Sequence, residues 1–265
     1  MNNKGYIGIW AGAGWLVILF MLAPLVVIFL GSFTSNEYLS LPYEPSLRWY
    51  GDVLDRPRFW DGFVKSLQLG LVSALLATLF GTSAAIALAR GSLPGVTAFS
   101  LMLMLPIIIP SVIISIALTQ FFSELRISTP YITLFVGHTI ITLPYVVRTV
   151  VASLNVMPRG LEWAAANLGA GPWRIIWHVV LPNIFPGVIG GAIFAFVVSF
   201  DTVTLSIFLL NASFVPLPIR LYEFAQTGVS PVLAAVSTLL IAFTALAVYA
   251  AERIAGLDVL FGVRR

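Results

Sequence analysis

The chain has 265 residues, of which 59% are hydrophobic and only 9% charged, and its formal net charge is +3. Its mean hydropathy of +1.00 excludes an ordinary soluble domain and predicts a protein embedded in a bilayer. The few basic residues are scattered, so nucleic acid binding has no support. Because the chain has no cysteine, disulfides and thiolate metal sites are excluded as well.

Most of the uncharged runs of the sequence are long enough to supply the roughly 20 apolar residues of a spanning helix. They predict an all-α membrane protein with one transmembrane domain over residues 1–265. The six expected transmembrane helices lie near residues 8–31, 65–89, 97–121, 130–153, 187–210 and 232–254. An even number of spans puts both termini on one side of the membrane.

The distribution of charge predicts which side that is. With both termini in the cytoplasm, the inner segments carry eight basic and three acidic residues, and the outer segments carry six basic and seven acidic residues. Cytoplasmic loops of membrane proteins are enriched in lysine and arginine, so this orientation is favoured. It also places the stretch from Met157 to Gly187 in the cytoplasm.

The second and third predicted helices carry residues that shape helix packing. Residues 66–89 are rich in glycine, alanine and small hydroxyl side chains, which let helices approach closely in lipid. In the third helix Pro106 and Pro110 each remove a backbone donor, so we expect kinks there. The freed carbonyl groups could line a cavity, or the prolines could simply bend a packing helix.

Polar side chains in the fourth and fifth predicted helices are candidates for a substrate path. Asp201 lies about 21 Å along the helix axis from Gly187, beyond the membrane midplane. A carboxylate there costs roughly 2.5–3.5 kcal/mol unless it faces water, a ligand or a partner, and it suits a cationic solute. The expected path residues are Asp201, Thr202, Ser199 and His138. The alternatives are a structural ion pair or hydrogen bond for Asp201 and a hydrogen-bonded packing role for His138.

The stretch from Met157 to Gly187 is amphipathic and lies between two predicted spans. Pro158 can open a short helix, and Gly169 can close it in the left-handed conformation. A second short helix is expected from Trp173 to Val180, with Leu181-Pro182 interrupting it before the next span. Because a helix of about two turns is unstable alone in water, we expect a partner protein, or alternatively lipid headgroups, to hold this stretch.

The order of residues in this stretch resembles the "EAA" loop of membrane subunits of binding-protein-dependent ABC importers. The matching strings are Ala164-Ala165, Leu168-Gly169-Ala170, Pro172-Trp173, Leu181-Pro182 and Pro186-Gly187. The resemblance implies the type I ABC importer permease fold, with a short cytoplasmic coupling helix in a loop over residues 157–182 that seats in a cleft of the ATPase. The implied ATPase-docking residues are Glu162, Trp163, Ala164, Ala165, Leu168, Gly169, Ala170 and Pro172.

This chain departs from the loop motif at one position. The motif's glutamate normally stands six residues before the glycine, where this sequence has Trp163, and Glu162 lies one residue earlier. The spacing from Gly169 to Leu181-Pro182 still fits the family pattern. The docking role is therefore expected, and the departure leaves open whether a glutamate makes the motif's specific contact with the ATPase.

Short strings elsewhere are similar to the polyamine-importer branch of this family, especially its second permease. They include Leu47-Arg48-Trp49-Tyr50, Leu143-Pro144-Tyr145 and Ser199-Phe200-Asp201. The resemblance implies a homologous second permease in a heterodimer, two ATPase subunits that bind ATP and Mg, and a periplasmic solute-binding protein. It implies import of spermidine or putrescine across the bacterial cytoplasmic (inner) membrane, with Tyr222 and Glu223 in an outer gate. Phosphonate, ferric ion and thiamine are the alternative solutes.

The sequence lacks the signs of ATP hydrolysis or other enzyme chemistry. It has no G-x-x-x-x-G-K-[ST] phosphate loop and no G-x-S-x-G elbow, and His138 and His178 are too far apart for zinc-protease spacing. We therefore expect a transport subunit without a cofactor or metal of its own. The rival classes are a polytopic membrane enzyme, which needs paired acid and base residues, and a secondary carrier, which needs no docking loop.

Overall fold

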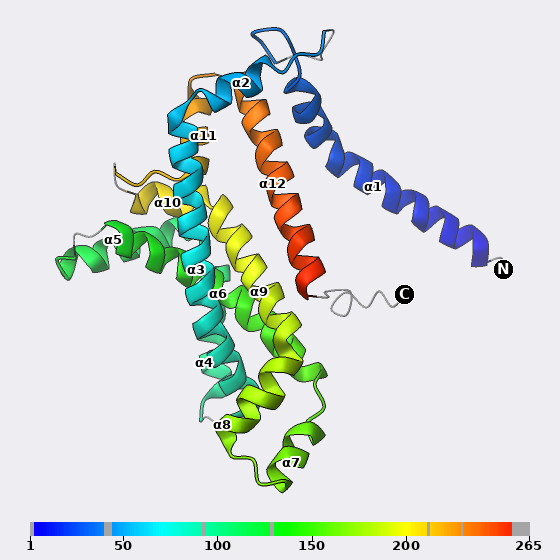
Figure 1. Ribbon diagram of the computed structural model, residues 1–265, viewed down its shortest axis with the longest axis vertical. Helices are drawn as coiled ribbons and strands as arrows, with labels where there is room; N and C mark the ends of the chain where they lie inside the picture. The colour runs from blue at the N-terminus through cyan, green and yellow to red at the C-terminus, as the bar shows by residue number, and fades with distance from the viewer. Residues whose placement is uncertain are drawn as a thin grey trace. The chain divides into compact units, whose positions relative to one another are not determined.

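The computed structural model describes residues 3–39, 44–91, 94–127, 130–210, 213–228 and 230–255. Within the helices, the side chains of residues 3–9, 130, 251, 252, 254 and 255 are not described. The tail over 256–265, whose Arg264 and Arg265 contribute to the predicted orientation, lies outside the described residues. The described residues are helical almost throughout, as the composition predicts (Figure 1).

The chain forms two compact units, and the first comprises Met1–Trp60 and Leu221–Phe243. Its longest helix is α1 (Asn3–Gly31), where residues 10–27 are all exposed. Trp49 of α2 (Arg48–Leu54) donates from Nε1 to the carbonyl oxygen of Thr34 at 2.7 Å, which ties the segment after α1 to α2. Parts of three further helices belong to this unit, namely α3 (Pro57–Arg90) to Trp60, α11 (Leu217–Gln226) from Leu221 and α12 (Pro231–Ala255) to Phe243.

The second unit comprises Asp61–Arg220 and Thr244–Arg265, and it holds the sites described below. Its core lies between α3, α6 and α9, and α6 runs beside α9 (Figure 1). Apart from the rest of α3, the helices of this unit are α4 (Val96–Ile108), α5 (Ser111–Glu124), α6 (Pro130–Val156), α7 (Gly160–Asn167), α8 (Pro172–Ile175), the π-helical turn η1 (Ile176–Val180), α9 (Leu181–Asp201) and α10 (Val203–Leu209).

Small residues let the three core helices approach closely. A Cβ atom added at Gly191 of α9 would lie 2.9 Å from the Cα of Val146 on α6, and one added at Gly81 of α3 would lie 2.9 Å from the Cβ of Val146. Ala77 and Ala85 of α3 are completely buried. The small side chains of the second predicted span therefore pack against neighbouring helices. Helices in lipid associate through such close packing, because the hydrophobic effect does not drive them together there.

Five helices of the described residues are long and apolar enough to cross a membrane, and they overlap five of the six predicted spans. They cover Trp10–Gly31, Pro57–Arg90, Tyr131–Val156, Pro172–Asp201 and Pro231–Ala250. The remaining predicted span, 97–121, corresponds to α4 and α5, which qualify together but are bent by 105°. The chain is therefore a multi-pass membrane protein.

The bend replaces the single helix expected over 97–121. Ile109 adopts an extended conformation, with φ −78° and ψ 129°, and Pro110 follows with φ −53° and ψ 131°. A residue before proline is pushed out of the helical region by the ring, and proline cannot donate a helical hydrogen bond. The kink expected near these prolines is thus a complete break between two helices.

The fifth predicted span, 187–210, also differs from the structure. The predicted interruption at Leu181-Pro182 is wrong, because α8, η1 and α9 form one helical run from Pro172 to Asp201. The wider π-helical turn just before Pro182 loosens the helix where the ring would otherwise clash. At the other end the helix stops at Asp201, since Thr202 is extended with φ −71° and ψ 107°, and α10 begins after it.

Replacing Gly191 with alanine tests the close contact between α6 and α9. The added methyl group would press on the backbone of Val146, which cannot rotate away, so we expect a loss of about 1–3 kcal/mol in stability. Thermal unfolding of the purified protein in mild detergent should show a lower midpoint. Gly14→Ala in α1 is the control, because nothing lies within 4 Å of its added Cβ. Equal midpoints for the two variants would contradict the proposed packing.

Candidate functional site

The loop between α6 and α9 folds as a short capped helix. Gly169 adopts the left-handed conformation with φ +84°, and its N–H donates to the carbonyl oxygen of Ala166 at 2.9 Å. The N–H of Ala170 donates to the carbonyl oxygen of Ala165 at 3.0 Å. These two bonds form a Schellman motif, which satisfies carbonyl groups at the end of α7 and accounts for the glycine.

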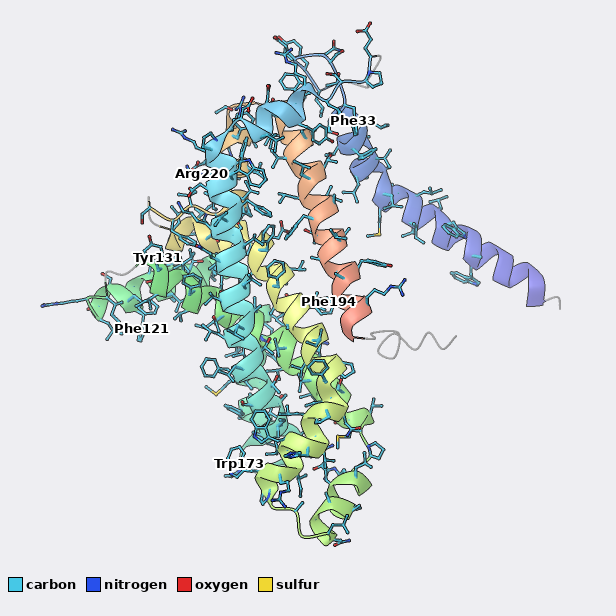
Figure 2. All side chains as sticks on the ribbon, viewed as in Figure 1. Phe33, Phe121, Tyr131, Trp173, Phe194 and Arg220 are labelled. Atoms are coloured by element: carbon cyan, nitrogen blue, oxygen red, sulfur yellow. The ribbon has the colours of Figure 1, made fainter. Side chains whose placement is uncertain are left out.

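Large apolar side chains are exposed on this loop. The exposed apolar set comprises Trp163, Leu168, Trp173 and Trp177, whose side chains are 67%, 89%, 75% and 63% exposed, and Figure 2 labels Trp173. No residue of α7 or α8 is buried. Of the other predicted docking residues, Ala164, Gly169 and Pro172 are exposed, while Ala165 and Ala170 are half-buried. Such a concentration of exposed tryptophan is typical of a surface that binds a protein or a membrane interface.

Glu162 differs from the other predicted docking residues because it is engaged within the chain. Its Oε1 accepts a hydrogen bond of 2.7 Å from Nε of Arg90, the last residue of α3. Arg90 also donates from Nη2 to the carbonyl oxygen of Leu154 in α6 at 2.9 Å. Arg159, just before α7, donates from Nη2 to the carbonyl oxygen of Ala89 at 3.2 Å. Sequence reasoning missed this network, because Arg90 and Glu162 are 72 residues apart and no local pattern links them.

The two helix breaks of this unit meet at one pocket of about 530 Å³. One wall is the break between α4 and α5, and another is the break between α9 and α10. Ile141 and Tyr145 of α6 complete the lining, with Pro106, Ile107, Ile108, Ile109, Pro110 and Ser111 from the first break and Val198, Asp201, Thr202, Val203 and Thr204 from the second. After the breaks, α5 and α10 pack on each other.

The pocket has a negative character. Asp201 is exposed, and its side-chain carboxylate forms no hydrogen bond or ion pair with any residue that the structure describes. The break at Pro110 leaves the carbonyl oxygens of Pro106, Ile107 and Ile108 without intrahelical donors, and a helix C-terminus carries partial negative charge. Tyr145 adds an aromatic ring, a side chain that attracts cations over its face. A carboxylate, a helix C-terminus and an aromatic ring together favour a cation.

His138 and Ser199 lie away from this pocket. His138 is completely buried in α6, and its Nδ1 and Nε2 lie 3.0 Å from the Oγ of Ser199 and 2.9 Å from the Oγ of Ser206. Both ring nitrogens therefore have partners in the core. These contacts fit the alternative expectation that His138 is a hydrogen-bonded packing residue. Of the four predicted path residues, Asp201 and Thr202 line the pocket together.

The predicted outer-gate residues lie in the first unit, and the pocket also contains residues that were not predicted. Tyr222 and Glu223 are exposed residues of α11 in the first unit. Tyr145 and Thr204 line the pocket without having been predicted as path residues, although Tyr145 belongs to a string that carried the family resemblance. Within the described ranges, no group of three or more histidine, cysteine, aspartate or glutamate residues could hold a metal ion.

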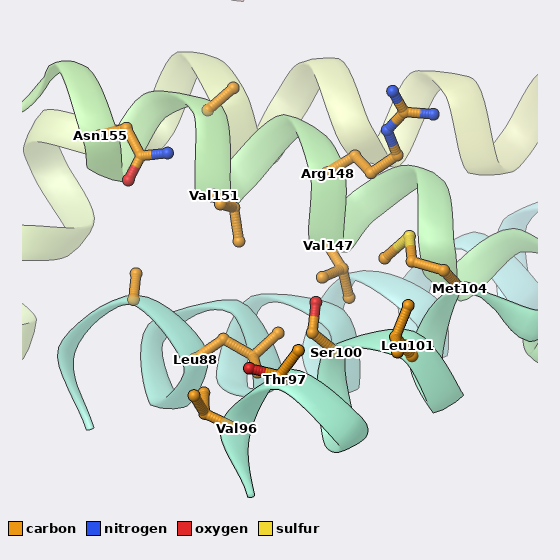
Figure 3. A pocket seen from close by; sticks show the side chains of 12 residues that line it. Leu88, Val96, Thr97, Ser100, Leu101, Met104, Val147, Arg148, Val151 and Asn155 are labelled. Atoms are coloured by element: carbon orange, nitrogen blue, oxygen red, sulfur yellow. The ribbon is translucent and has the colours of Figure 1, made fainter. Parts of the chain in front are cut away.

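A second cavity, of about 700 Å³, lies between the end of α3, α4 and α6 (Figure 3). Val147 and Val151 point into it from α6, and Ser100 points towards them from α4. The guanidinium group of Arg148 points away from α4 in Figure 3. The cavity is therefore lined mainly by apolar side chains with a few polar groups, and Arg148 is the charged residue among its described lining residues.

Comparisons with known proteins agree with these features. The chain is 30% identical over 226 residues to the spermidine/putrescine transport system permease protein PotC of Haemophilus influenzae, covering 85% of this chain and 88% of that protein. It is 28% identical over 229 residues to the putrescine transport system permease protein PotI of Escherichia coli, covering 84% and 82%.

A solved structure supports the same fold. A chain of a bacterial ABC transporter that imports the acidic polysaccharide alginate superposes with a TM-score of 0.73 at 18% identity, covering 96% of this chain and 98% of that one. Residues 77–255 match the family model described as the inner membrane component of binding-protein-dependent transport systems. The chain belongs to this family, and it is an ABC importer permease.

Proposed function

We propose that this permease is driven by a separate ATPase that grips the loop between α6 and α9. The exposed apolar set supports this proposal most directly, because Trp163 of the eight-residue helix α7, Leu168 just after it and Trp173 of α8 all expose large hydrophobic surfaces. Such a helix needs a partner to hold it. The complete importer comprises this chain, a homologous second permease, two ATPase subunits that bind ATP and Mg, and a periplasmic solute-binding protein. This chain itself performs no hydrolysis.

The proposed location is the bacterial inner membrane, with both termini and the docking loop in the cytoplasm. The excess of basic over acidic residues in the inner segments supports this orientation. The same orientation places the exposed apolar set where an ATPase can reach it. On the opposite side, Tyr222 and Glu223 of α11 are proposed to belong to an outer gate, since both are exposed on a short helix that precedes the last span.

The proposed substrate is a polyamine, spermidine or putrescine. Two relatives are named for these solutes, and the pocket beside Asp201 has the charge that a polyamine needs. A carboxylate with no partner among the described residues attracts an alkylammonium group without a protein cation in competition. Thr202 and Thr204 offer hydroxyl groups, and Tyr145 offers an aromatic face for the same cation. The substrate therefore passes Asp201 on its way through the membrane.

Substitutions in the exposed apolar set test docking. Leu168→Asp and Trp173→Ser should each lower co-purification of the ATPase from mild detergent by about tenfold, because buried aromatic and apolar anchors dominate protein interfaces. Uptake should fall in parallel. Tyr38→Ser is the control for co-purification, since Tyr38 is 80% exposed on the proposed outer side. If both loop variants keep the ATPase bound and the uptake intact, the docking proposal is wrong.

Neutralising Asp201 tests the substrate path. Asp201→Asn keeps the side-chain shape but removes the charge that concentrates cations, so uptake of spermidine or putrescine into vesicles holding the whole importer should fall about tenfold. Asp61→Asn is the control, because Asp61 is a 48% exposed carboxylate that already pairs with Lys65. Unchanged uptake kinetics in Asp201→Asn would remove Asp201 from the path.

A further inference from the structure

Arg90 and Arg159 cap each other's helix. Arg90 ends α3 and donates to Leu154, whose carbonyl lies in the last turn of α6. Arg159 follows α6 and donates to Ala89, whose carbonyl lies in the last turn of α3. The last four carbonyl groups of a helix have no intrahelical donors, and a cation there is favoured by the helix dipole. The ends of α3 and α6 are thus joined by reciprocal charged hydrogen bonds.

Glu162 attaches the short helix α7 to this junction. The Nε of Arg90 donates to the carboxylate at 2.7 Å while Nη2 of the same guanidinium holds Leu154. The side chains of Arg90 and Glu162 are only 14% and 19% exposed, so solvent screens the pair weakly. One planar guanidinium on α3 therefore contacts both α6 and α7, an arrangement that lysine, with a single compact charge, reproduces poorly.

The covalent connections of α7 restrict its position much less than the ion pair does. Only Met157, Pro158 and Arg159 join it to α6, and only residues 168–171 join it to α8. Since α7 has no buried residue, the packing of its own side chains holds it only weakly in place. The ion pair is the contact by which α7 can push or pull on the end of α3, a helix that is distant in sequence and lies in the core with α6 and α9.

We propose that Arg90 and Glu162 form a coupling latch, in which Arg90 is a positioning residue that transmits displacement of α7 directly to the ends of α3 and α6. This inference rests on the proposed function, in which an ATPase moves α7. The glutamate of this loop is then an internal transmission contact, whereas the exposed apolar set provides the affinity for the ATPase. Loss of the latch uncouples ATP hydrolysis from transport while leaving the docking surface intact.

The test measures uptake per ATP hydrolysed in vesicles containing the complete importer. Arg90→Gln and Glu162→Gln should each lower this ratio at least about fivefold, the lower end of typical coupling between sites, with ATPase co-purification near the wild-type level. The double variant should be no worse than Arg90→Gln alone, because Arg90→Gln already removes the contact with Glu162. Lys65→Gln, which removes an ion pair with Asp61 elsewhere on α3, is the matched control and should leave the ratio unchanged.

Conservative and reversed variants separate coupling from folding. Arg90→Lys should retain an intermediate ratio, and the reversed pair Arg90→Glu with Glu162→Arg should recover part of what either reversal alone loses. An unchanged ratio in Arg90→Gln and Glu162→Gln, or loss of the ATPase from these variants, would overturn the latch. If the wild-type chain itself retains no ATPase, the docking proposal fails instead, so the two failures are distinguishable.

Discussion

The close contact between α6 and α9 is the constraint on which the second unit depends. Gly191 brings the backbone of α9 against Val146, and Gly187 faces Ser153 and Thr149 one turn away. Lipid provides no hydrophobic force to press helices together, so their association relies on dispersion contacts that only close approach provides. With this register fixed, the loop between α6 and α9 lies at one end of α9 and Asp201 at the other.

Because the helical run from Pro172 to Asp201 is continuous, it links the loop between α6 and α9 to the pocket beside Asp201. These residues form one helical run of 30 residues, or roughly 45 Å at the standard rise of an α-helix. The π-helical turn η1 accommodates Pro182 without breaking the run. In the proposed mechanism this run carries a displacement of the loop between α6 and α9 to the pocket, and the proposed latch of Arg90 and Glu162 engages α3 and α6 at the loop end.

The pocket depends on two breaks that resemble each other. After Ile108 and after Asp201 the chain leaves the helix for one or two residues and resumes as α5 and α10, which pack on each other. Non-helical backbone at membrane depth is tolerated where it lines a cavity or is buried in protein. Asp201 at the end of α9 faces an unfavourable helix dipole, which a bound cation would offset.

His138 illustrates how a buried polar group can be structural. Its two ring nitrogens contact Ser199 of α9 and Ser206 of α10, so it bridges the helices on both sides of the break at Thr202. A buried imidazole with partners for both nitrogens avoids the cost of an unsatisfied polar group. It thereby helps to fix the direction in which α10 leaves α9.

Local patterns in the sequence were sufficient for the membrane location, the approximate helices and the family. Apolar runs limit where helices can span, Gly169 marks the cap of α7, and Pro106 and Pro110 mark a bend. The exposure of the docking residues also follows from the amphipathic stretch between two spans. The extent of the bend at Pro110 and the continuity through Pro182 did not follow, because the effect of a proline depends on what packs around the freed backbone.

Only the tertiary structure decided which distant residues meet. Asp201 and Thr202 share a pocket with the break at Pro110, whereas His138 and Ser199 bond to each other in the core. Glu162 pairs with Arg90 across 72 residues. The sequence by itself determined that this is a multi-pass permease with an exposed amphipathic loop and a membrane carboxylate, since those properties arise from composition and local order. The side chains that surround each charge depend on helix packing, which brings together residues that no local pattern relates.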